Sequence, residues 1–109
     1  MITVHILRLD DNRIHGFQVE GHAGYADPGE DIVCAGVSSI TVGTVNSIEA
    51  LTGTVMRTRM KNGFLSASLP SVVEESAASQ VQLLLESLVV MLQGIADSYG
   101  EYIQIQDMK

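Results

Sequence analysis

The sequence is short of cysteine, of basic residues and of long apolar runs, and each shortage excludes a class of protein. It has a single cysteine among 109 residues, which excludes an internal disulfide framework and the paired-cysteine spacing of zinc sites. Six Lys and Arg stand against 13 Asp and Glu, a formal net charge of -7. Because nucleic-acid phosphates attract Lys and Arg, this balance argues against direct binding of DNA or RNA. It leaves room for a basic partner.

No uninterrupted apolar run approaches the roughly 20 residues that cross a bilayer. The longest apolar-rich stretch, 81–96, is broken by Gln82, Glu86, Ser87, Gln93 and Gly94. The first residues carry no basic cluster before an apolar segment, so no signal peptide is expected. We therefore expect a cytoplasmic protein without a membrane segment. With 46% hydrophobic residues, residues 1–109 can form a single domain around one core.

Alternation of apolar and polar residues predicts five β-strands. These stretches are 2–9, 13–21, 54–60, 64–69 and 102–106. A polar cluster at 10–12 is typical of a turn and predicts a hairpin between the first two strands. Asn62-Gly63 predicts a second hairpin, of the type in which both turn residues accept positive φ.

Apolar residues at every third or fourth position predict two helices. The first stripe comprises Val33, Val37, Ile40, Thr44, Ile48 and Leu51, and Gly53 should end that helix. The second stripe comprises Ala78, Val81, Leu85, Leu88, Leu92 and Ile95, between a capping box at 71–74 and a stop at Gly100. The order β-β-α-β-β-α-β predicts an α+β fold: a single-layer, mostly antiparallel sheet with two helices on one face.

Cys34 lies just inside the predicted start of the first helix, where unpaired N–H groups and the helix dipole stabilise a thiolate. A cysteine nucleophile needs a base within hydrogen-bond reach. His22 closes the second strand, and the next loop leads directly to Cys34, so we expect the two to meet. His15 is a second candidate for the base. Burial of Cys34 as a small apolar residue is the structural alternative.

Other residues around Cys34 have candidate supporting roles. Asp31 is expected to be the helix N-cap and could also orient His22. Ser38 lies one turn after Cys34 on the same face and could donate to His22 or to a substrate carbonyl. The backbone N–H groups of Cys34 and Ala35 are candidate oxyanion donors. The glycine-containing loop is expected to close over a substrate; it comprises Gly24, Tyr25, Ala26, Asp27, Pro28, Gly29 and Glu30.

Two short segments carry a family resemblance. Gly21-His22-Ala23-Gly24-Tyr25-Ala26 is followed, after a glycine-containing loop, by Asp31-Ile32-Val33-Cys34-Ala35-Gly36-Val37-Ser38. The pair, at this separation, resembles the bacterial ribosomal-processing cysteine proteases (Prp), and length and element order agree over the whole chain. Family members often have alanine where this chain has Gly36.

The resemblance implies a catalytic pair at His22 and Cys34, with Asp31 and Ser38 as possible supporting residues and no cofactor or metal. It also implies a homodimer. The expected reaction removes a short N-terminal extension from the large-subunit ribosomal protein numbered twenty-seven, after a hydrophobic motif ending in phenylalanine. Two other functions would fit the residues: a ribosome-associated binding module with a buried Cys34, or a thiol redox protein that uses a partner thiol.

Overall fold

The computed structural model describes residues 1–27 and 31–108, the last of them by its backbone alone. The elements occur in the predicted order β-β-α-β-β-α-β. They are β1 (Ile2–Arg8), β2 (Ile14–Glu20), α1 (Ile32–Thr52), β3 (Arg57–Lys61), β4 (Phe64–Ser68), α2 (Glu75–Tyr99) and β5 (Ile103–Met108).

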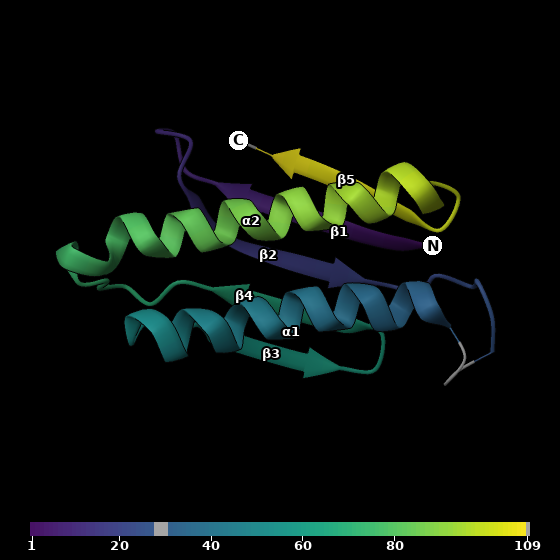
Figure 1. Cartoon of the computed structure of the whole chain (residues 1–109), viewed down its shortest axis with the longest axis horizontal. Coiled ribbons are helices and arrows are strands. Elements are labelled where there is room, and N and C mark those ends of the chain that lie inside the picture. The colour runs from purple at the N-terminus through teal and green to yellow at the C-terminus, as the bar shows by residue number, and fades with distance from the viewer. Residues whose placement is uncertain (28–30, 109) are drawn as a thin grey trace.

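The five strands form one sheet in the order β3-β4-β2-β1-β5. Both predicted hairpins are present, since β1 pairs with β2 and β3 pairs with β4 in antiparallel fashion. The fifth strand lies parallel to β1 at one edge, while β3 is the other edge (Figure 1). The α+β fold with a mostly antiparallel sheet is therefore confirmed.

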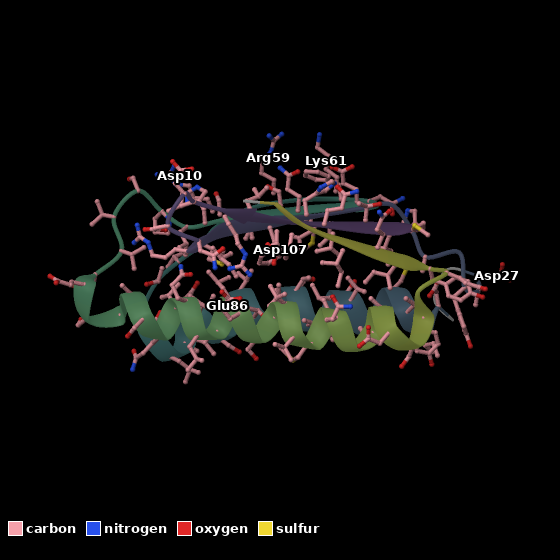
Figure 2. The ribbon with its side chains drawn as sticks, turned by 90° about the horizontal axis from the view of Figure 1, so that it is seen from above. Asp10, Asp27, Arg59, Lys61, Glu86 and Asp107 are labelled. Carbon is pink, nitrogen blue, oxygen red and sulfur yellow. The ribbon has the colours of Figure 1, made fainter. Side chains whose placement is uncertain are left out.

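Both helices cover the same face of the sheet, and the core lies between the two layers (Figure 2). The strands bury one face because alternate side chains point to opposite sides. The largest fully buried side chains are Phe17, Ile6, Ile14, Ile48, Leu85, Leu88, Leu92 and Ile103. The other face of the sheet is open, and Arg59 and Lys61 of the edge strand β3 point away from the helices there (Figure 2).

The ends of α1 follow the sequence prediction, but the start of α2 does not. Asp31 caps α1, and Gly53 ends it in the left-handed conformation with φ 77°. The apolar stripe predicted for α1 was wrong at Leu51, whose side chain is 71% exposed near the helix end. The capping box at 71–74 was also wrong, because α2 begins at Glu75 and its N-cap, Glu74, makes no side-chain cap hydrogen bond.

The β3–β4 turn also differs from the prediction. Gly63 has φ 74°, whereas Asn62 is not among the residues of positive φ. A negative φ followed by a positive φ is the pattern of a type II turn, in which only the second position favours glycine. The positive φ expected at both positions was therefore wrong for Asn62.

Both helices are long and apolar enough to cross a membrane when judged by length and composition alone. The expectation that the chain has no membrane segment was drawn from uninterrupted apolar runs, which is a stricter criterion than helix length and mean composition. One stripe of each helix packs against the sheet, and the core helices of soluble proteins pass the same test.

Three segments meet at one end of the molecule. The end of β2, the start of α1 and the β3–β4 turn lie together at the right of Figure 1. The register explains part of this arrangement, because Glu20 at the end of β2 pairs with Phe64 at the start of β4. Residues distant in sequence are thereby placed around the start of α1.

Candidate active site

Cys34 lies in the first turn of α1 and is half-buried, with its sulfur facing the chain that follows β2. The backbone N–H of Ala23 donates a hydrogen bond to Cys34 Sγ over 3.3 Å. This bond holds the sulfur toward the segment that carries His22. Cys34 is thus neither sealed in the core nor without a stabilising partner.

His22 is positioned by a sharp turn at Gly21. Gly21 has φ 88°, and a Cβ on it would lie 2.4 Å from the carbonyl oxygen of Met1, so only glycine fits there. Its N–H donates to the carbonyl of Gly63 over 2.8 Å. A Cβ on Gly63 would in turn lie 2.9 Å from His22 Nε2. The imidazole of His22 therefore packs against Gly63, where any other residue would place its Cβ too close to the ring.

Two cavities share Cys34 and His22 in their walls. The first has a volume of about 340 Å³, and its apolar lining comes from both layers. That lining includes Ile2, Val19, Val37, Val42, Met60 and Leu65. The second, of about 650 Å³, surrounds the start of α1 and includes the polar side chains of Asp31, Ser38 and Asn62. The cysteine and the histidine thus lie where the first cavity meets this second cavity.

No hydrogen bond joins His22 to Cys34 within the part of the chain that the structure describes. Catalytic hydrogen bonds are often long or misaligned before substrate binds. Of the other histidines, His15 is exposed near the far end of β2, roughly 23 Å along the strand from His22 at about 3.3 Å per residue. His5 alternates with the buried residues of β1 and so faces the open side of the sheet. Neither shares a wall with Cys34.

Asp31 binds backbone N–H groups rather than His22. Its Oδ1 accepts from Val33 N and Cys34 N, each over 3.0 Å, and its Oδ2 accepts from Tyr25 N over 3.1 Å. These bonds, the one from Cys34 first, hold the pKa of the Asp31 carboxyl below its usual value. Asp31 is thus a helix cap that also fixes the loop, and the structure places no bond from it to His22 among the described residues.

The two predicted oxyanion donors are already engaged. The N–H of Cys34 donates to the Asp31 side chain, and the N–H of Ala35 donates to the Asp31 carbonyl over 3.0 Å. Their role as oxyanion donors stays a prediction, and in this structure the N-cap residue accepts both N–H groups. Ser38 is exposed and lines both cavities beside Cys34, as its spacing suggested.

The predicted substrate loop is described as far as Asp27, and its residues Pro28, Gly29 and Glu30 lie outside the described part. Gly24 and Ala26 line the second cavity, at the start of α1. Tyr25 packs edge-to-face on Tyr99 and Tyr102, with ring centroids 5.8 Å and 5.1 Å apart. The loop therefore leaves the catalytic region anchored to the end of α2.

Sequence reasoning missed three contributions to the site: the N–H of Ala23, Asn62 and Gly63. The sequence did mark Asn62-Gly63 as a turn, but nothing in it placed that turn beside His22, which depends on β4 pairing with β2. Among residues 1–27 and 31–108, no cluster of three His, Cys, Asp or Glu side chains could hold a metal ion.

The fold and the cleft define the class of protein as a small cysteine peptidase. Comparison with known proteins gives the family: its sequence model, described as Cysteine protease Prp, matches residues 1–104. The chain belongs to this family.

The chain is similar to two proteins called ribosomal processing cysteine protease Prp. It is 32% identical to that of Bacillus subtilis (strain 168), over 96% of each chain. It is 33% identical to that of Staphylococcus aureus (strain Mu50 / ATCC 700699), over 96% of this chain and 97% of the relative.

Two crystal structures of Prp from S. aureus have the same fold. One, in complex with a covalently linked product peptide, has a TM-score of 0.88 and 31% identity, covering 99% of this chain and 100% of that one. The other, with a substrate peptide, has a TM-score of 0.83 and 30% identity over the same shares. The chain is thus a cysteine protease of a ribosomal-processing family.

Proposed function

We propose that this chain is an endopeptidase in which Cys34 is the nucleophile and His22 the general base. Its substrate is the N-terminal extension of the large-subunit ribosomal protein numbered twenty-seven, removed during ribosome assembly. The observation that carries the proposal is that Cys34, at the start of α1, and His22 line the same two cavities. The names of the relatives, which are ribosomal processing proteases, support the substrate.

The apolar cavity supports cleavage after a hydrophobic motif ending in phenylalanine. Its volume of about 340 Å³ and its aliphatic walls suit one large apolar side chain. Because Cys34 and His22 stand at its rim, a phenylalanine bound there brings its own carbonyl carbon to the sulfur. The peptides in the S. aureus structures support a peptide substrate in this cleft.

The reaction follows from the groups at the rim. His22 takes the proton of the Cys34 thiol, and the sulfur forms a bond to the carbonyl carbon while the carbonyl electron pair moves to oxygen. As the pair returns, the C–N bond breaks and the leaving amine takes the proton from His22. Water, deprotonated by His22, then attacks the thioester and releases the acid and the thiol. The Ala23 N–H stabilises the thiolate at both stages.

The chain, residues 1–109, is proposed to act as a single domain in the cytoplasm without direct contact to nucleic acid.

The chain is further proposed to form a homodimer. Leu83 and Val90 on the outer side of α2 are 70% and 71% exposed, which gives a second copy apolar surface to bury. Sedimentation equilibrium tests this: a monomer at micromolar concentration contradicts it.

The direct test is cleavage of a precursor peptide that spans the proposed junction. Cys34→Ala should abolish cleavage, and His22→Ala should lower kcat/KM by 10²-fold or more. His15→Ala is the matched control, since it removes an imidazole from β2, outside the cleft, and should leave the rate unchanged. Mass spectrometry of the products locates the bond that is cut.

The remaining outcomes separate the alternatives. If Cys34→Ala cleaves the peptide at the wild-type rate, Cys34 is not the nucleophile. No cleavage by the wild type, with slow and unselective alkylation of Cys34, favours a binding module. Formation of a sulfenic acid with peroxide, without peptidase activity, favours a redox protein.

A further inference from the structure

The helix start leaves the reaction without an assigned oxyanion donor. When the thiolate attacks, the carbonyl oxygen gains negative charge and needs a hydrogen-bond donor at about 2.7–3.1 Å. The N–H groups of Cys34 and Ala35 both bind Asp31, and the N–H of Ala23 points at the sulfur. A donor from another wall of the cleft is therefore required.

Asn62 supplies a carboxamide on the wall opposite α1. It lies in the turn between β3 and β4, and it lines both cavities together with His22 and Cys34. Its side chain is exposed and makes no hydrogen bond to any described residue. A side-chain N–H thus remains available at the rim where the scissile carbonyl must lie.

The backbone of the turn does not require asparagine. Asparagine is favoured in hairpin turns where its φ is positive, but only Gly63 has a positive φ here. The first position of a type II turn accepts most residues and favours proline. The residue type at 62 is therefore not explained by the turn, whereas a role for its carboxamide in the cleft explains it.

The turn is held in place relative to the catalytic pair. The carbonyl of Gly63 accepts the N–H of Gly21, the residue before His22, over 2.8 Å. The imidazole of His22 packs against Gly63, where a Cβ would come within 2.9 Å of Nε2. The backbone that carries Asn62 is therefore fixed beside the catalytic pair, and its side chain needs only to turn toward the carbonyl oxygen.

We propose that the Nδ2–H of Asn62 donates a hydrogen bond to the oxygen of the scissile carbonyl and to the oxyanion of each tetrahedral intermediate. This rests on the proposed function of Cys34 and His22. Asn62 neither gains nor loses a proton; it stabilises the charge on oxygen while His22 moves the proton. Asn62 is then a catalytic residue contributed by the β3–β4 turn.

The test compares two reactions of the same sulfur. Cleavage of the precursor peptide passes through an oxyanion, whereas alkylation of Cys34 by iodoacetamide does not. Asn62→Ala should lower kcat for the peptide by 10²–10³-fold and leave the alkylation rate within twofold. Asn62→Asp keeps the shape of the side chain but places an acceptor at the oxyanion, so it should be at least as slow. Asn46→Ala, the same change at an exposed position of α1 outside both cavities, should match the wild type.

Three outcomes overturn the proposal, and they can be distinguished from one another. If Asn62→Ala and Asn62→Asp both cleave at more than a third of the wild-type rate while Cys34→Ala is inactive, Asn62 is not the donor. If alkylation falls in parallel with cleavage, the residue acts on the thiolate or on the fold. If Cys34→Ala remains active, the proposed function itself fails and this inference fails with it.

Discussion

Gly63 and Gly53 have almost the same backbone conformation but different surroundings. Their φ angles are 74° and 77°, and a Cβ on Gly53 would meet nothing within 4 Å, whereas one on Gly63 would meet His22. Alanine at either position costs about 1 kcal/mol because the left-handed region disfavours a Cβ. The two positions therefore separate backbone strain from the contact with the imidazole.

We expect Gly63→Ala to lower kcat/KM at least tenfold, because its methyl group moves the His22 ring from its place beside Cys34. Gly53→Ala should lose a similar amount of stability and keep its activity. The measurement is the thermal midpoint of each variant together with its kcat/KM for the precursor peptide. Equal activities in the two variants would show that the contact between position 63 and the His22 ring does not affect catalysis.

Asp31 illustrates how much of the site can be predicted from residue type. Its position before an apolar helix predicted an N-cap, and the structure has it there with two backbone N–H donors. Its third bond, to the N–H of Tyr25, could not be predicted, because it depends on the path of the intervening loop. The hydrogen bonds from Cys34 N–H and Ala35 N–H to Asp31 are likewise visible only in the coordinates.

At the scale of elements, periodicity predicted the helices and the central strands because one face of each is buried, whereas β3 is exposed along its whole length. The strands alternate with period two, and the buried residues of α2 recur every three or four positions. Patterns that lack a buried face predicted less. The capping box at 71–74 is exposed, so nothing there favours a helical start over an extended one, and α2 begins later.

The loop after His22 is an element without a buried stripe, and its anchor is aromatic. Tyr25 contacts Tyr99 at the end of α2 and Tyr102 before β5. Such edge-to-face pairs contribute about 0.5–1.5 kcal/mol beyond the area they bury. Among residues 23–27 the Tyr25 ring therefore adds an attachment to the hydrogen bond that its N–H makes with Asp31.

Tyr25→Ala should release this attachment, raise KM for the precursor peptide several-fold and change kcat less. Tyr25→Phe keeps both ring contacts and should behave as the wild type. Hydrogen exchange at the amides of residues 23–27 should become faster in the alanine variant alone. A loop that exchanges equally fast in both variants would contradict the anchoring role.

At the scale of the whole molecule, one arginine ties three elements together. Arg8 of β1 has a side chain only 7% exposed and donates to Glu86 of α2 over 2.7 and 2.9 Å. It also donates to Asp107 of β5 over 2.6 and 3.0 Å. Figure 2 shows Glu86 and Asp107 between the helices and the sheet. The hydrogen bonds from Arg8 hold the pKa of Glu86 below its usual value.

Arg8→Met should destabilise the fold by about 2 kcal/mol at neutral pH, which lowers the thermal midpoint by roughly 8–16 °C in a domain of this size. Because the pKa of Glu86 is lowered in the folded state, its contribution is complete above the unfolded value, about 4.3. It is lost as the pH falls through the folded value. The difference between wild type and variant should therefore shrink below pH 4, as urea titrations at pH 7 and pH 3 can measure. A difference in unfolding free energy between wild type and Arg8→Met that is the same at both pH values would contradict this account.

The basic row on β3 has a consequence for the behaviour of many copies together. Arg57, Arg59 and Lys61 alternate along an edge strand whose outer backbone groups have no neighbouring strand among the described residues. An uncharged edge strand of this kind could pair with the edge strand of another copy, and repeated pairing would build fibres. Three like charges on each copy make two such edges repel at close approach. In a concentrated solution the sheet should therefore not grow by pairing of its β3 edges.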